Sequence, residues 1–120
     1  MIAKPFLVDS HCHLDFAEFD GERDEIVARA RANGVDLMVT ISTHIAKLSK
    51  LLEITRRYEN VYASVGTHPL NAAEEPDVST DKIVRLSKEP KVVAIGEAGL
   101  DYYYDRAPPE TQKRVFERHI

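Results

Sequence analysis

The chain has 120 residues, 43% hydrophobic and 30% charged, a balance that fits one small globular domain and excludes a disordered or membrane-embedded protein. The net charge is −4 and acidic and basic residues are mixed along the chain, so we expect no basic surface for duplex nucleic acid. No apolar run reaches the roughly 20 residues of a membrane helix, and the single cysteine and the absence of a signal-peptide pattern predict a cytoplasmic protein without a membrane partner.

Four short apolar runs alternate with four helical patterns. The apolar runs read PFLVDS, VDLMVTI, VYASVG and VVAIGE, and they begin roughly 25 to 30 residues apart. Their nearly continuous apolar character is typical of parallel strands that are covered on both faces. The helical patterns cover residues 22–33, 45–58 and 80–89, and a fourth begins at 108–109. This alternation predicts an α/β fold built from parallel βα units.

The number of units leaves two architectures open. Four units can form a complete doubly wound domain, or they can be the first half of a (β/α)₈ barrel. The helical pattern still continues at Ile120, without a cap or a glycine. The sequence therefore favours a truncated TIM barrel in which residues 1–120 are the N-terminal half, with no second domain.

The stretch DSHCHLD, at residues 9–15, directly follows the first apolar run. Successive side chains of a strand alternate between its two sides, so His11 and His13 are expected to point together and Cys12 away from them. Two imidazoles on one side can bind a divalent metal ion. The alternative interpretation is a pair of histidines that only decorates the end of a strand.

Two further candidates follow later strands. His68 follows the third apolar run in VGTHP, and Glu97 follows the fourth in IGEAGLD. The carboxyl ends of parallel strands form the ligand-binding rim of such folds, so we expect these residues to converge with His11 and His13. The alternatives are a turn-forming histidine before Pro69 and a solvated loop carboxylate.

Three aspartates flank these motifs and have two interpretations each. Asp9, Asp15 and Asp101 can stabilise local turns, or they can orient the histidines that bind a metal. For two other histidines the sequence predicts a structural role. His44 is expected at the start of a helix, and His119 is expected to pack on a helix face.

Taken together, the motifs resemble those of one enzyme family. DSHCHLD, VGTHP and IGEAGLDYYYD, followed by a helix with Gln112 and Phe116, resemble in order and interval the motifs of the TatD family of metal-dependent deoxyribonucleases. The resemblance covers essentially the whole chain. It implies a TIM barrel, a two-metal centre containing Mg, Mn or Zn, and hydrolysis of phosphodiester bonds in DNA, often from the 3′ end, with 3′ ends or single strands as substrate.

The resemblance also implies roles for individual residues. His11 and His13 resemble the histidines that bind the first metal, Glu97 resembles the carboxylate that bridges both metals, and His68 resembles a catalytic histidine that faces the phosphate. The family's remaining histidine and aspartate ligands follow later strands that have no counterpart here. His119 stands where family members usually carry a glutamine. The chain thus resembles half of an enzyme, with about half of its metal shell.

Two alternative functions remain open. Amidohydrolases that cleave C–N or ester bonds also begin with His-x-His, although they commonly carry a lysine where this chain has Glu97. A non-catalytic, truncated product is the second alternative. Four strands leave two sheet edges unpaired, so we expect the isolated chain to be inactive as a nuclease and to self-associate.

Overall fold

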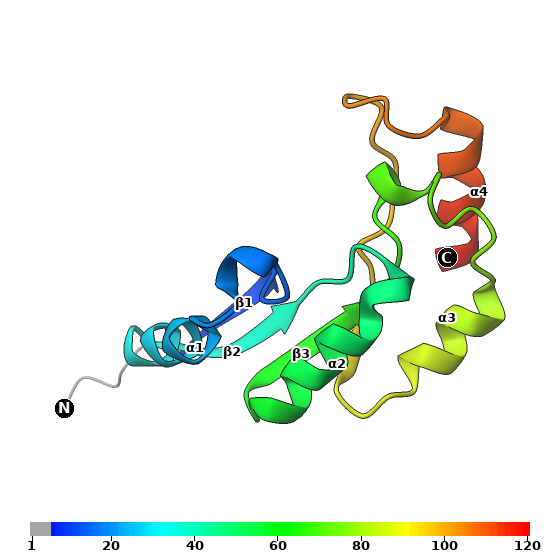
Figure 1. The fold of residues 1–120 in the computed structure, drawn as a ribbon. Coiled ribbons are helices and arrows are strands. Elements are labelled where there is room, and N and C mark those ends of the chain that lie inside the picture. Colours follow the sequence, from blue (N-terminus) through cyan, green and yellow to red (C-terminus); the bar gives the residue numbers. More distant parts are fainter. Residues whose placement is uncertain (1–5) are drawn as a thin grey trace.

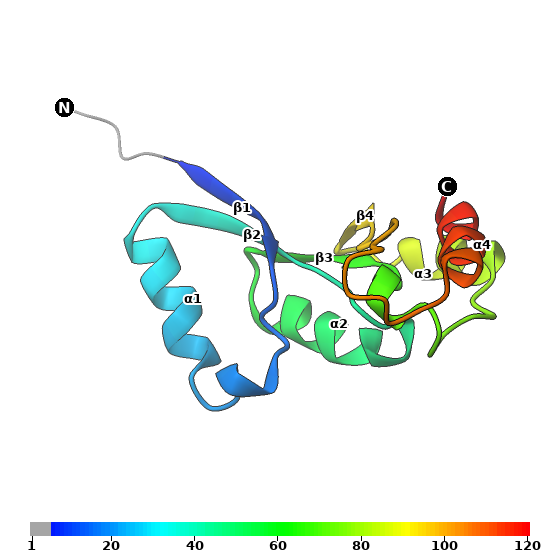
Figure 2. The ribbon, with the colours of Figure 1, turned by 90° about the horizontal axis from the view of Figure 1, so that it is seen from above.

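The computed structural model describes residues 6–120 and shows one four-stranded parallel sheet in the order β1-β2-β3-β4 (Figure 1 and Figure 2). The strands are β1 (Leu7–Cys12), β2 (Val35–Thr40), β3 (Val61–Val65) and β4 (Val92–Ile95). The helices that follow them are α1 (Arg23–Ala32), α2 (Leu48–Arg57), α3 (Thr80–Ser87) and α4 (Pro109–His119). Three short 3₁₀ helices precede α1, α2 and α3, namely η1 (Ala17–Phe19), η2 (Ile45–Lys47) and η3 (Pro69–Asn71). The predicted βα repeat is confirmed.

The helices begin and end close to the predicted residues, for local reasons. After α1, Gly34 adopts a φ of 91°, which only glycine reaches without strain, and the chain turns there into β2. The Ser79 hydroxyl accepts a hydrogen bond from the Lys82 amide (3.1 Å) and caps α3. The pattern predicted as one helix over 45–58 is divided into η2 and α2. Within residues 6–120, no helix combines the length and the apolar character that crossing a bilayer requires.

The core lies between the central strands and the helices. One cluster joins α2 and α3 to β3 through Leu51, Ile83, Ala63 and Val65, and a second joins α1 to the start of β3 through Val27 and other apolar residues. Leu51 is 1% exposed. Burial of such a side chain stabilises the fold by about 1.5–3 kcal/mol. Helix α2 is therefore the main cover of the sheet's centre.

The two edge strands are much less covered than the centre. Helices α1 and α2 lie on the same side of the first three strands (Figure 2). Five of the six β1 residues are exposed, and Val93, Ala94 and Ile95 of β4 are exposed as well. Val8 is 51% and Val93 57% exposed. Apolar side chains at two open edges of one sheet are surfaces suited to further pairing.

Candidate metal centre

The end of β1 presents its two histidines as the alternation predicted. His11 lies within β1 and His13 directly after it, and the His11 amide donates a hydrogen bond to Asp9 Oδ1 (3.0 Å). Between them, the Cys12 thiol donates to the Val39 carbonyl (3.4 Å) and packs against a core cluster. Burial, reinforced by Asp9 and Asp15, raises the pKa of Cys12 to about 12. Cys12 is therefore a buried neutral thiol.

Glu97 follows β4 and is held by the backbone of the neighbouring strands. Its amide donates to the Ser42 carbonyl (3.0 Å), and the Gly96 amide donates to the Val65 carbonyl (2.9 Å). Gly66 lies so close to Gly96 that a Cβ at Gly66 would come within 2.7 Å of the Gly96 carbonyl carbon. The absence of a side chain at Gly66 lets the chain after β3 approach the chain that positions Glu97.

Buried hydroxyls continue the strand pairing beyond the ends of the strands. Ser42 Oγ donates to the Gly66 carbonyl (2.7 Å), and Ser64 Oγ donates to the Gly96 carbonyl (2.7 Å). The Ser42 amide donates to Ser64 Oγ (3.0 Å). Ser42 and Ser64 are at most 1% exposed. We call these two residues the hydroxyl ladder. It links the chain ends after β2, β3 and β4.

His11, His13 and Glu97 converge at this rim, and we call them the metal trio. Each offers a ligand atom that lies within 4.8 Å of the other two. His11 Nε2 is 3.4 Å from Glu97 Oε2. The two histidines come from β1 and the carboxylate from β4, which are the two outermost strands of the sheet. The sheet therefore curves enough to bring its edges together at this end.

The unpaired buried atoms at and beside the trio, and its types of ligand, fit a metal site. His13 Nδ1 is buried and has no hydrogen-bond partner among the described residues, and the same holds for Asp15 Oδ1. Leaving a buried polar atom unpaired costs about 1–3 kcal/mol, which a bound ion at or beside such an atom can offset. The His13 ring is fixed by stacking on Phe16, with ring centres 4.7 Å apart. Two imidazoles and a carboxylate suit Zn²⁺ or Mn²⁺.

His68 lies beside the trio with its proton position defined by a hydrogen bond. Its Nδ1 accepts from the Leu70 amide (3.0 Å), so in the neutral ring the proton is on Nε2. His68 Nε2 is 3.2 Å from Glu97 Oε1. The two oxygens of Glu97 therefore face different histidines, His11 on one side and His68 on the other. His68 can donate a hydrogen bond to Glu97 or to a substrate oxygen nearby.

The three predicted flanking aspartates differ in what they contact. Asp9 binds the His11 backbone, and Asp101 Oδ1 accepts from the Tyr103 amide (2.9 Å). Asp15 is 8% exposed and lies next to the trio in the chain. Among the described contacts, none of these carboxylates reaches a histidine ring. Asp9 and Asp101 therefore stabilise local backbone.

Sequence reasoning missed the way in which His119 supports the rim. His119 Nδ1 is 2.7 Å from the Val115 carbonyl, which can only accept, so this nitrogen carries the proton. Nε2 is then free to accept from the Thr67 amide (3.0 Å), next to His68. Spacing within α4 placed His119 on a helix face but gave no sign of this partner 52 residues away.

Glu75 is a second supporting residue that the sequence did not reveal. Its two carboxylate oxygens accept from the amides of Ile45 and Ala46 (both 2.8 Å), at the start of η2. The Thr67 hydroxyl also donates to Glu75 (2.8 Å). His44, expected at a helix start, does immediately precede η2, and its ring contacts Glu74. These bonds tie together the loops that follow β2 and β3.

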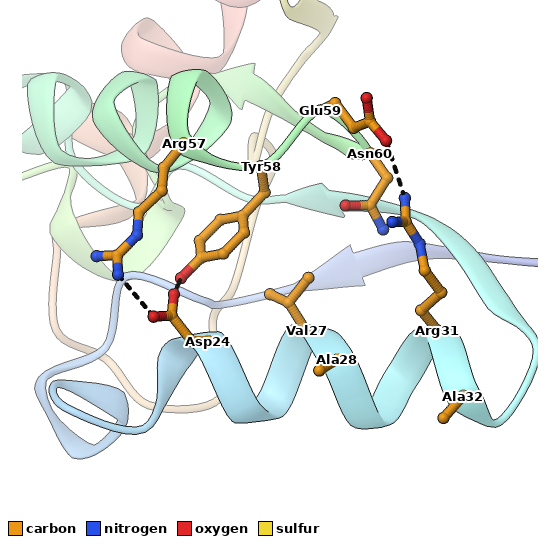
Figure 3. Close-up of a pocket in the computed structure, with 9 residues that line it drawn as sticks. All are labelled: Asp24, Val27, Ala28, Arg31, Ala32, Arg57, Tyr58, Glu59 and Asn60. Carbon is orange, nitrogen blue, oxygen red and sulfur yellow. Dashed lines mark hydrogen bonds and ion pairs between the residues drawn. The ribbon is translucent and has the colours of Figure 1, made fainter.

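A cavity of about 420 Å³ opens on the trio. It is lined by the trio and His68 together with Phe16, Thr43, His44, Lys47, Leu70, Asn71 and Arg106. A separate groove of about 570 Å³ lies near the start of β3, at the other end of that strand, and Figure 3 shows its walls. Asp24 contacts Arg57 and Tyr58 at one end of this groove, and Arg31 pairs with Glu59 at the other. Its charged side chains are already paired with one another.

The chain as a whole is similar to known proteins of one family. A family described as TatD related DNase matches residues 8–120. The "Uncharacterized metal-dependent hydrolase YabD" of Bacillus subtilis is 36% identical over 114 residues, which are 95% of this chain and 45% of that protein. The "3'-5' ssDNA/RNA exonuclease TatD" of Salmonella typhimurium is 35% identical over 95% of this chain and 44% of its own length.

The fold is similar to that of solved TatD homologues as well. The crystal structure of YJJV, a TatD homologue from Escherichia coli, matches with a TM-score of 0.84 and 30% identity, covering 94% of this chain and 44% of that one. The chain thus spans less than half the length of these relatives, and its four βα units correspond to the first four units of their TIM barrel. On the match over residues 8–120 and on this shared fold, the chain belongs to the TatD-related DNase family.

Proposed function

We propose that this protein is a metal-dependent hydrolase that cleaves phosphodiester bonds of nucleic acid, acting from the 3′ end of single strands. The observation that carries the proposal is the metal trio, whose ligand atoms from β1 and β4 lie within 4.8 Å of one another. The name of the Salmonella relative, a 3′-5′ exonuclease of single-stranded DNA and RNA, supports the substrate. Divalent ions held there would lower the pKa of water and neutralise phosphate charge.

The residues of the trio have distinct tasks in this proposal. His11 and His13 would hold one divalent ion, with Zn²⁺ or Mn²⁺ preferred over Mg²⁺ because imidazole nitrogen is a poor ligand for Mg²⁺. Glu97 would supply carboxylate oxygens to the metal centre, and its two oxygens already face different neighbours, His11 and His68. Further ligands of the second ion would come from a part of the protein that corresponds to the rest of its relatives.

His68 acts on the substrate in this proposal. Its Nε2 carries the proton because Nδ1 accepts from the Leu70 amide, and it points toward the carboxylate of Glu97. A phosphate oxygen bound at the trio would receive this hydrogen bond, and a charge-assisted bond of this kind contributes about 1.5–3 kcal/mol. His68 thus holds the phosphate in place for attack by water.

The Glu97→Gln variant, made in a polypeptide that also supplies the later strands of the barrel, tests the proposal. We expect it to lower metal affinity and hydrolysis of a 3′-hydroxyl oligonucleotide by at least about 100-fold, because a neutral amide bridges two cations poorly. Metal content is measured after dialysis, and hydrolysis by release of mononucleotides. Glu74→Gln is the matched control, since Glu74 lies on the same rim, pairs with His44 and lies outside the trio. Full metal content and normal hydrolysis in Glu97→Gln would refute the proposal.

A further inference from the structure

Two cationic side chains that do not belong to the metal trio line its cavity. Lys47 is the last residue of η2, and Arg106 lies in the loop between β4 and α4. Both side chains are exposed and both line the cavity. Of the cavity's lining residues, Glu97 is the only carboxylate. The walls around the trio therefore carry positive charge in a chain whose net charge is −4.

Many cations of this protein are paired with carboxylates, and the exposed Lys82 and Arg114, which have no such partner among residues 6–120, lie outside the cavity. Arg23 pairs with Asp20, Arg57 with Asp24 and Arg31 with Glu59. Over residues 6–120, by contrast, no carboxylate lies within ion-pair distance of Lys47 or Arg106. The Arg106 guanidinium lies over the Tyr104 ring, 5.8 Å from its centre. Contact with a ring face leaves the N–H groups of an arginine free to donate.

The two cations come from different connections that border the same cavity. Lys47 belongs to the connection after β2, Arg106 to the connection after β4, and His68 follows β3, which lies between those strands. A chain of phosphates bound at the trio would therefore meet positive charge from two separate segments of the cavity wall. Arginine binds a phosphate through two parallel hydrogen bonds, and lysine binds it as a point charge.

We propose that Lys47 and Arg106 bind the two phosphates that flank the scissile phosphate of a single-stranded nucleic acid. The inference rests on the proposed function, which places the scissile phosphate at the trio. A duplex is disfavoured because it requires a broad basic surface, whereas this cavity carries two cations in a chain whose net charge is −4. Lys47 and Arg106 bind substrate in this arrangement, and neither takes part in the chemical step.

Binding without hydrolysis provides the direct test. The protein is titrated in EDTA against a fluorescein-labelled oligothymidylate, and anisotropy is recorded at several salt concentrations. Lys47→Ala and Arg106→Ala should each weaken binding by about 10-fold, and each should reduce the slope of log K against log salt by about 0.7, the value for one phosphate contact on a single strand. Arg106→Lys should recover part of the affinity, because it restores charge but not the paired hydrogen bonds.

Lys82→Ala and Arg114→Ala are the matched controls, since both side chains are exposed on helices and neither lines the cavity. Both should bind within about twofold of the unchanged protein, as expected for cations without a phosphate contact. A methylphosphonate oligonucleotide, whose backbone is neutral, should bind weakly and should not distinguish Lys47→Ala from the unchanged protein. If Lys47→Ala and Arg106→Ala keep the affinity and the salt slope of the unchanged protein, or if the unchanged protein does not bind, the inference is overturned.

A parallel assay with Mn²⁺ or Zn²⁺, on a polypeptide that also supplies the later strands of the barrel, separates this inference from the proposed function. If the oligonucleotide binds with the expected pattern but is not cut, the hydrolase proposal fails and the phosphate-binding residues stand. If it is cut, and both alanine variants cut it with unchanged KM, the hydrolase proposal stands and the role of Lys47 and Arg106 is rejected. The inference predicts a raised KM with nearly unchanged kcat in both variants.

Discussion

The central strand β3 and the edge strands β1 and β4 have opposite surroundings. Four of the five β3 residues are buried, whereas β1 and β4 are largely exposed. Yet the edge strands supply the metal trio, and β3 supplies none of it. Stability and the candidate chemistry therefore depend on different strands. Changes in the centre should affect folding first, and changes at the edges should affect ligand binding first.

The largest expected effect is on stability, at the centre. Leu51→Ala should reduce the free energy of unfolding by about 3 kcal/mol, because it leaves a cavity between α2 and β3. Val93→Ala, at the exposed edge strand β4, should change it by less than about 0.5 kcal/mol. Urea unfolding followed by circular dichroism measures both. Similar losses in the two variants would show that the edge is as well packed as the centre.

Gly66→Ala should lower both the stability of the fold and the affinity of the trio for metal. A Cβ at Gly66 meets the Gly96 backbone at 2.7 Å, and neither backbone can yield without moving Glu97. We expect a loss of about 1–3 kcal/mol in stability together with a clear loss of metal affinity.

Gly21→Ala is the matched control for that experiment. Gly21 has a φ of 84° and nothing within 4 Å of an added Cβ, so alanine there strains the backbone at a residue that neither belongs to the trio nor lines its cavity. This variant should be destabilised but should bind metal normally. Normal metal affinity in Gly66→Ala would show that the strand crossing does not position Glu97.

A smaller effect is expected at His119. His119→Leu removes the acceptor of the buried Thr67 amide, which should cost about 1–2 kcal/mol. His119→Gln should recover most of this loss, since its side-chain oxygen can accept the same bond. The ¹H–¹⁵N NMR signal of Thr67 should shift strongly in the leucine variant and little in the glutamine variant. Identical signals in both variants would remove His119 from the support of the rim.

The smallest expected effect concerns acid stability at the groove in Figure 3. The hydrogen bond from Tyr58, and then the Arg57 charge, lower the pKa of Asp24 below its usual 3.8. A lowered folded-state pKa adds stability above pH 3.8, and this contribution is lost as the pH falls through the folded-state value. Asp24→Asn should therefore flatten the decrease in stability on acidification below pH 3.8.

Urea unfolding at pH values on both sides of 3.8 measures this effect. Asp77→Asn, an exposed carboxylate in the loop before α3, is the matched control and should leave the acid dependence unchanged. If the two variants respond alike, the contact between Asp24 and Tyr58 does not contribute to stability.

The sequence predicted the parts of this structure that depend on the local pattern of apolar and turn-forming residues. Apolar runs and glycine or proline boundaries predicted the four βα units, and the shared edge of parallel strand ends predicted that His11, His13 and Glu97 converge. It did not predict which side chains of the helices and connections support or line this rim. The partner of His119 is 52 residues away, and Lys47 lines the cavity at the trio because of where the connection after β2 places η2. Such contacts depend on tertiary packing, which spacing does not encode.

The hydroxyl ladder affects how this rim can change during evolution. Ser42 and Ser64 fix the chain ends after β2, β3 and β4 to one another through backbone carbonyls, below the connections that follow. The strand ends that position Glu97 are thus fixed independently of the connections that follow them. Connections above the ladder can lengthen, shorten or exchange residues while Glu97 keeps its place, so new substrate preferences can arise without rebuilding the metal trio.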